Sequence, residues 1–156
     1  MCGRIWAIAL ASLMRRPADR WTPRVLVVDD SPEMVQLLAA WLEEEACEVV
    51  TALSGRQALD AAAEFYPDIV FLDVVLPPPD GFQVCEALKQ RLAPEVILMT
   101  GVANPLAARR GADLGVVALL QKPFTHEAAM AAFSTALERC RRDPLAGLRQ
   151  HFGSRA

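Results

Sequence analysis

The chain has 156 residues, a formal charge of −3, a hydrophobic fraction of 53% and a charged fraction of 22%. This length suits one domain with a sizeable core, and the composition is typical of a globular protein rather than a disordered one. The net negative charge and the lack of a dense basic stripe argue against a nucleic-acid-binding surface. We therefore expect a globular protein without direct nucleic-acid contacts.

The N-terminal extension, residues 1–23, contains an apolar stretch at 5–14, followed by Arg15 and Arg16. Ten residues are too few to span a bilayer, which takes about 20, so we do not expect stable membrane insertion. A secretory signal carries its positive charges before the apolar region, not after it. A later translation start, for example at Met14, and a loosely packed helix are both open interpretations, and anchoring at a membrane surface is the alternative.

From residue 24 onward, short apolar runs alternate with stretches of helical periodicity. Four runs are typical of strands that are buried on both faces of a parallel sheet, namely 25–28, 69–72, 96–99 and 116–120. A fifth and less apolar strand, at about 48–52, is predicted to lie at a sheet edge.

Helices are predicted between the strands, and turn residues mark their ends. The first helix begins at Ser31 and Pro32. Its predicted apolar face consists of Met34, Leu37, Leu38, Trp41 and Leu42. The later helices are predicted from Ser54 to Pro67, after the loop 77–81, from Asn104 to Gly111 or Gly115, and after Thr125. We expect Trp41, Met130 and Phe133 in the core.

This alternation predicts one α/β domain over residues 24–141, with a five-stranded parallel sheet and helices on both faces. The tail at 142–156 is too short to form an output domain. The cysteines are Cys2, Cys47, Cys85 and Cys140, and none of their spacings is that of a metal-ligand pair. Apolar neighbours around Cys47 and Cys85 favour buried, reduced thiols in a cytoplasmic protein, with a disulfide as the alternative.

Polar residues stand at the ends of the four buried runs. These residues are Asp29, Asp30, Asp73, Thr100 and Lys122. Because binding sites of open α/β sheets form at the carboxyl ends of the strands, we expect these side chains to converge. Three carboxylates, a hydroxyl and an ammonium group together suit a divalent cation and a phosphoryl group. Taken alone, the aspartate pair at 29–30 could instead cap the helix that follows.

These residues also form four sequence motifs in a characteristic order. The motifs are Val28-Asp29-Asp30-Ser31, Asp73-Val74-Val75-Leu76-Pro77 with Asp80-Gly81, Met99-Thr100-Gly101, and Lys122-Pro123-Phe124. With these four motifs, the chain resembles the receiver domains of two-component response regulators, in particular the stand-alone, chemotaxis-regulator-like type. The resemblance covers about 24–141 and implies a flavodoxin-like fold with strand order 2-1-3-4-5 and a cis bond before Pro123.

The resemblance also implies a set of functional roles. Asp73 would be the phosphoacceptor, and Thr100 and Lys122 would contact the phosphoryl group. Mg²⁺ would bind Asp30, Asp73 and the backbone carbonyl of Val75, with Asp29 acting mainly through water. The phosphoryl donor would be a sensor histidine kinase or a histidine phosphotransfer protein. The signal would pass to a downstream protein by contact, and the only catalysis would be the domain's own phosphorylation and dephosphorylation.

Three residues depart from the common receiver pattern. Leu119 stands where receivers commonly carry an aromatic switch residue, and Val75 and Val102 stand where many receivers have polar residues. The alternative function is a pseudo-receiver, a binding module that signals without phosphate. An aspartate-nucleophile phosphatase is disfavoured, because that class usually needs a second acid at the position of Val75.

Overall fold

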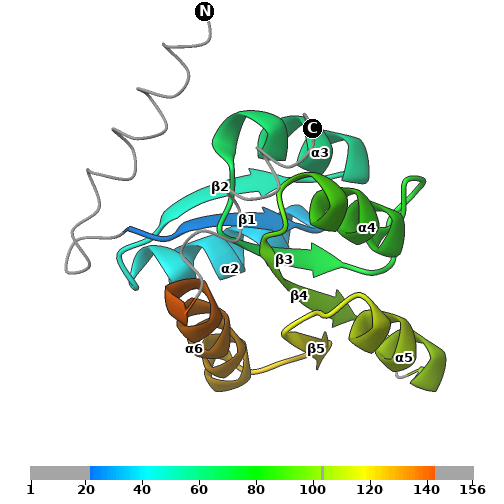
Figure 1. Cartoon of the computed structure of the whole chain (residues 1–156). Helices are drawn as coiled ribbons and strands as arrows, with labels where there is room; N and C mark the ends of the chain where they lie inside the picture. Colours follow the sequence, from blue (N-terminus) through cyan, green and yellow to red (C-terminus); the bar gives the residue numbers. More distant parts are fainter. Residues whose placement is uncertain (1–21, 103, 143–156) are drawn as a thin grey trace, which may run out of the picture.

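The computed structural model describes residues 22–102 and 104–142. The elements in chain order are β1 (Arg24–Val28), α2 (Pro32–Glu43), β2 (Glu48–Ala52), α3 (Gly55–Phe65), β3 (Ile69–Asp73), α4 (Gly81–Arg91), β4 (Glu95–Thr100), α5 (Pro105–Asp113), β5 (Ala118–Gln121) and α6 (His126–Arg142). All strand pairs are parallel, and the sheet order is β2-β1-β3-β4-β5 (Figure 1). The predicted flavodoxin-like topology is confirmed.

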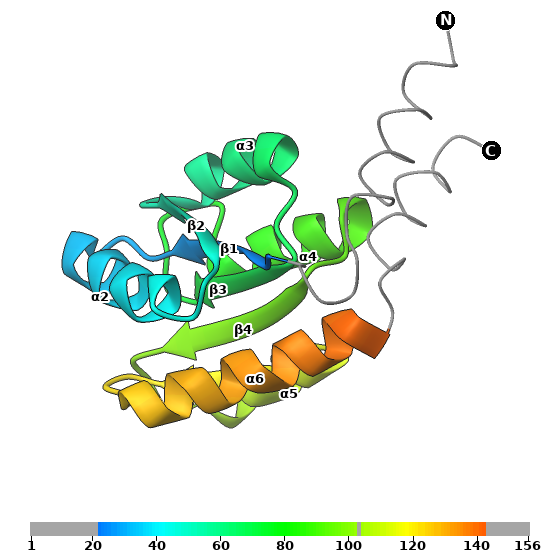
Figure 2. The same cartoon turned by 90° about the vertical axis from the view of Figure 1, so that its left-hand side faces the viewer.

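Helices cover both faces of the sheet, and each face has its own hydrophobic core (Figure 2). The helices α3, α4 and α5 lie on one face, and α2 and α6 lie on the other. Alternation along the strands divides the apolar side chains between the two cores. In β3, for example, Val70 and Leu72 face α3–α5, whereas Ile69 and Phe71 face α2 and α6.

The strands differ in burial according to their place in the sheet. Every residue of β3 is buried, as are nearly all residues of β1 and β4. The prediction of a strand buried on both faces at 116–120 is wrong, because β5 spans Ala118–Gln121 and its apolar residues are only half-buried. β5 pairs with β4 alone and therefore forms an edge of the sheet. β2 forms the other edge, as predicted.

The first helix begins as predicted, and its core-facing side differs from the predicted one at Leu37. Ser31 caps α2, because its hydroxyl accepts a hydrogen bond from the Met34 N–H at 3.3 Å. Leu37 was predicted in the apolar face but is 44% exposed, whereas Val35 is buried. The residues 35, 38 and 42, at steps of three and four, form the buried stripe. Trp41 packs against the α2–α6 core without full burial.

The final helix covers the same face of the sheet as α2. Phe133 is buried in α6 as predicted, whereas Met130 is only partly buried against that core. His126, the first residue of α6, is exposed and meets the Trp41 ring edge-on, with the ring centroids 5.0 Å apart.

Close backbone packing determines the path of the loop between β3 and α4. A Cβ atom at Gly81 would lie 2.1 Å from the carbonyl oxygen of Asp73, and one at Gly55 would lie 2.2 Å from that of Pro79. Only glycine allows such close approaches. Asp80 and Gln83 then form a capping box, in which each side chain accepts a hydrogen bond from the other residue's backbone N–H.

Three cysteines are free thiols in the described residues, namely Cys47, Cys85 and Cys140, and this agrees with the reduced state predicted for Cys47 and Cys85. Full burial was predicted for Cys47 and Cys85 but holds only for Cys85, because Cys47 is half-buried before the edge strand β2. The apolar stretch 5–14 and Cys2 lie outside the described residues. Among the residues that the structure describes, no helix has the length and apolar character to cross a membrane.

Candidate functional site

The site is built from the carboxyl ends of the three central strands. Asp29 follows β1, Asp73 is the last residue of β3, and Thr100 is the last residue of β4. Their exposed fractions are 0%, 4% and 3%, and no other polar or charged residue of the described ranges is buried. Burying polar groups costs free energy unless they have partners. The free-energy cost of burying polar side chains therefore falls at the carboxyl ends of the central strands.

Asp29, Asp30 and Asp73 form the predicted carboxylate cluster. One oxygen from each carboxylate lies within 4.8 Å of the others, and Asp30 is the exposed member. Burial raises the pKa of Asp73 above its ordinary value, and the negative charge of Asp29 raises this pKa further. Lys122 acts in the opposite direction but does not reverse the shift in the Asp73 pKa. Burial and the neighbouring carboxylate together thus outweigh the lysine in setting the Asp73 pKa.

Lys122 reaches this cluster from the edge of the sheet. It follows β5, its peptide bond to Pro123 is cis as predicted, and its backbone N–H donates to the Thr100 carbonyl at 2.7 Å. Its ammonium group donates to Asp29 Oδ2 and, at 3.1 Å, to Asp73 Oδ2. Burial by itself lowers the Lys122 pKa, but the hydrogen bond to Asp29 and the two carboxylate charges outweigh burial and raise it.

The carboxylate of Asp73 is held on both sides. Its Oδ2 accepts the hydrogen bond from Lys122, and its Oδ1 accepts one from the Val75 N–H at 3.1 Å. The neighbouring backbone is also tied down, because the Val74 N–H donates to the Met99 carbonyl at 2.8 Å. These bonds orient the carboxylate plane relative to the strand ends.

The Thr100 hydroxyl is bonded to its own loop. It donates to the Val102 carbonyl at 3.1 Å and accepts a hydrogen bond from the Val102 N–H at 3.2 Å. Leu119, at the usual aromatic position, is half-buried and shares a cavity with Thr100. The hydroxyl thus lies at the strand end as predicted, with a protein partner.

The structure brings together four of the five side chains that the sequence singled out, because Lys122 contacts the cluster of three aspartates. The Thr100 hydroxyl contacts only its own loop, at the end of the strand next to β3. The contact between Lys122 and Asp29 was not among the predicted roles. The capping role of Asp80 was also missed, although the spacing of Asp80 and Gln83 is a capping-box signal.

Comparison with known proteins gives the family. The family model of the response regulator receiver domain matches residues 25–134. The chain belongs to this family. Receiver domains are regulatory domains rather than classical enzymes.

Two curated relatives illustrate the sequence similarity. The receiver is 35% identical over 117 residues to the alkaline phosphatase synthesis transcriptional regulatory protein PhoP of Bacillus subtilis, covering 74% of this chain and 49% of the relative. It is 34% identical over 127 residues to the DNA-binding dual master transcriptional regulator RpaA of Synechocystis, covering 80% of this chain and 53% of the relative. The chain thus spans about half the length of these relatives. Because their names refer to transcription or DNA binding, the expected lack of nucleic-acid contacts stays a prediction.

Solved structures of other receivers match this fold over nearly the whole of their own length. The chemotaxis response regulator CheY4 of Vibrio cholerae matches with a TM-score of 0.69 and 28% identity, covering 74% of this chain and 99% of that chain. A response regulator receiver domain protein from Clostridium thermocellum matches with a TM-score of 0.72 and 27% identity, covering 77% of this chain and 98% of that chain.

Proposed function

We propose that this receiver is a phosphoacceptor that takes a phosphoryl group onto Asp73. The donor is a phosphohistidine of a sensor histidine kinase or a histidine phosphotransfer protein, and the signal passes to a downstream protein by contact. The observation that carries this proposal is the carboxylate cluster at the strand ends, with Lys122 bonded to the buried Asp73. Family membership supports the same role.

The chemistry begins with a carboxylate oxygen of Asp73. This oxygen forms a bond to phosphorus while the phosphorus–nitrogen bond of the donor breaks, and the departing imidazole nitrogen keeps the electron pair. The hydrogen bonds from Val75 and Lys122 hold the Asp73 carboxylate in one orientation before the donor arrives. Fixing a nucleophile in this way removes part of the entropic barrier to reaction.

The donor atoms of the cluster fit Mg²⁺. This ion prefers oxygen ligands, and three carboxylate oxygens lie within 4.8 Å of one another. Asp30, Asp73 and the backbone carbonyl of Val75 would hold the ion, with Asp29 acting mainly through water. When bound, the ion supplies positive charge that stabilises the charge on the phosphoryl oxygens in the transition state.

Two side chains must exchange partners as the product forms. The Lys122 ammonium group shifts from Asp73 to a phosphoryl oxygen, which retains a charge-assisted hydrogen bond. The Thr100 hydroxyl donates to another phosphoryl oxygen and therefore leaves the Val102 carbonyl. The loop between β4 and α5 loses that bond, so phosphorylation can alter the surface formed by α5, β5 and α6, where we expect the output contact.

Phosphorylation with a small-molecule donor tests the proposal. Incubation with acetyl phosphate and Mg²⁺ should add one phosphoryl group per chain by intact-mass spectrometry, and Asp73→Asn should abolish this addition. Asp60→Asn is the matched control, because Asp60 lies on the surface of α3 in an ion pair with Arg56. Equal labelling of the Asp73 variant would refute the assignment. An unlabelled wild type would favour the phosphorylation-independent pseudo-receiver instead.

A further inference from the structure

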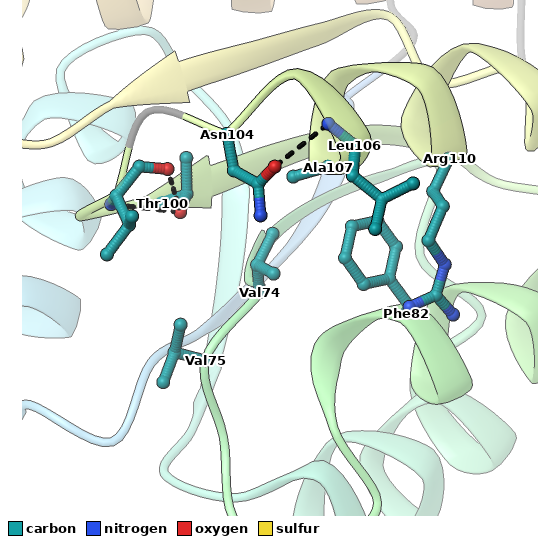
Figure 3. Close-up of a pocket in the computed structure, with 9 residues that line it drawn as sticks. Val74, Val75, Phe82, Thr100, Asn104, Leu106, Ala107 and Arg110 are labelled. Atoms are coloured by element: carbon teal, nitrogen blue, oxygen red, sulfur yellow. Dashed lines mark hydrogen bonds between the residues drawn. The ribbon is translucent and has the colours of Figure 1, made fainter.

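A second concave surface lies beside the phosphoacceptor site, between the β3–α4 loop, α4 and the start of α5 (Figure 3). Phe82 lines it from α4, Leu106 from α5, and Val75 from the β3–α4 loop. The Lys122 side of the site does not contribute to this pocket. Val75 and Thr100 line this pocket and also border the phosphoacceptor site, so the two surfaces adjoin.

The pocket collects exposed apolar side chains. Val75, Val102 and Leu106 are 61%, 63% and 63% exposed, and all three line this pocket. They make up half of the exposed large hydrophobic residues of the described chain. Single exposed apolar residues are ordinary, but clustered ones mark interaction sites. This concentration therefore points to a partner that covers them.

The size of the pocket limits what can enter it. Its volume is about 150 Å³, and an engineered apolar cavity of about 150 Å³ binds one benzene molecule. One large apolar side chain fits this space, whereas small-molecule ligand sites usually measure roughly 300–1,000 Å³. A protein segment that inserts one side chain is therefore the better match.

A guanidinium group stands at the edge of the pocket. Arg110 of α5 lies over the Phe82 ring, with Cζ 4.1 Å from the ring centroid (Figure 3). Within the described ranges Arg110 is exposed and forms no ion pair with a carboxylate. Stacking on the ring holds the planar group in place while its N–H donors remain available. A carboxylate on the partner would complement it.

We propose that this pocket docks a segment of a protein partner that inserts one large apolar side chain and pairs a neighbouring carboxylate with Arg110. The chain's own apolar stretch at 5–14 is a poorer occupant, because it contains no carboxylate and lies between Arg4 and Arg15. The docking surface is present without a phosphoryl group. Docking to the unphosphorylated chain can therefore be tested directly.

An alanine-based helical peptide with Phe and Glu four residues apart is a suitable probe, because side chains at this spacing lie on one helix face. Titration of the ¹⁵N-labelled full chain should shift the amide signals of Leu106, Ala107 and Arg110. Replacing the peptide Phe with Ala should weaken binding by roughly tenfold, from the loss of apolar burial. Replacing the peptide Glu with Gln should weaken it by roughly two- to fivefold, as expected for an exposed ion pair.

Two protein variants complete the test. Leu106→Asp should abolish the amide shifts. Arg110→Glu should weaken binding of the Glu peptide and strengthen binding of a matched peptide that carries Lys in place of Glu. Both positions are exposed, and an amide spectrum that otherwise matches the wild type will show that each variant is folded. Acetyl phosphate labelling is measured separately, so binding with this pattern supports the pocket whether or not Asp73 is labelled.

Three outcomes would overturn the proposal. The first is peptide binding that neither variant changes, and the second is amide shifts that lie away from α4 and α5. The third is concentration-dependent self-association of the chain that Leu106→Asp removes, because the occupant would then be a second copy of this protein.

Discussion

The two ends of the sheet differ in how their charged side chains are paired. At the carboxyl end, three carboxylates face the one ammonium group of Lys122. At the amino end, the acidic side chains have basic or backbone partners. The Asp68 carboxylate accepts the Arg24 N–H at 2.9 Å, Arg24 lies 3.5 Å from Glu48, and Arg139 lies 3.6 Å from Glu95.

The ionisable groups at the two ends of the sheet also differ in their expected reactivity. Burial raises the pKa of the Cys140 thiol to about 12, and its Sγ donates to the Asp68 carbonyl at the amino end. That thiol stays neutral and unreactive at ordinary pH. The three clustered carboxylates at the carboxyl end, by contrast, are expected to repel one another in the metal-free folded state and to favour a bound cation. One end of the sheet is thus arranged for stability and the other for binding.

The largest expected difference between the two ends of the sheet is the effect of a carboxylate substitution on Mg²⁺ affinity. Asp30→Asn removes one of three clustered carboxylates and should weaken Mg²⁺ binding by roughly tenfold or more, because affinity depends on ligand charge. Asp68→Asn removes a carboxylate at the amino end and should leave this affinity unchanged. Calorimetric titration of the wild type and both variants measures the effect. Equal affinities in all three proteins would place the cation elsewhere.

Stability without metal should change in opposite directions at the two ends. Asp30→Asn relieves repulsion in the cluster and should raise the free energy of unfolding. Asp68→Asn weakens the charge-assisted hydrogen bond to Arg24 and should lower it by about 1–2 kcal/mol. Urea unfolding in a chelator measures both changes. If both variants were destabilised, the carboxyl end would not be under electrostatic strain. With saturating Mg²⁺, Asp30→Asn should instead have a lower free energy of unfolding than the wild type.

The lifetime of the phosphorylated state should depend on two apolar residues at the otherwise polar carboxyl end. Val75 and Val102 follow Asp73 and Thr100 in the loops and are mostly exposed. Neither side chain can orient an attacking water, so we expect slow hydrolysis of the acyl phosphate. Polar replacements in a Val75→Asn, Val102→Glu double variant can each add a hydrogen bond of about 1 kcal/mol, which is several-fold in rate.

The decay of phosphorylated protein measures this difference. Leu53→Asn, which changes an exposed apolar residue on the neighbouring β2–α3 loop, is the control and should decay like the wild type. Unchanged or slower decay in the double variant would show that the valines do not shield the phosphorus.

Local patterns predicted the parts of the molecule that depend on local chemistry. The cap at Ser31, the central strands and the polar strand ends are visible in the sequence because buried parallel strands are continuously apolar. The prediction of Leu37 in the core failed because helical periodicity defines several adjacent stripes, and the position of α2 on the sheet selects one of them. β5 was predicted as fully buried because an apolar run does not reveal whether a neighbouring strand will cover it.

The order of elements and the identity of the residues at the strand ends were determined by the sequence alone, because strand and helix periodicities and end residues are local properties. The tertiary structure decided how these residues share partners. Lys122 bonds to both Asp29 and Asp73, which lie 93 and 49 positions away in the chain. It also placed Arg110 on the Phe82 ring and brought three exposed apolar residues to the lining of one pocket. Such contacts depend on how helices and loops pack in space, and no spacing within the chain specifies them.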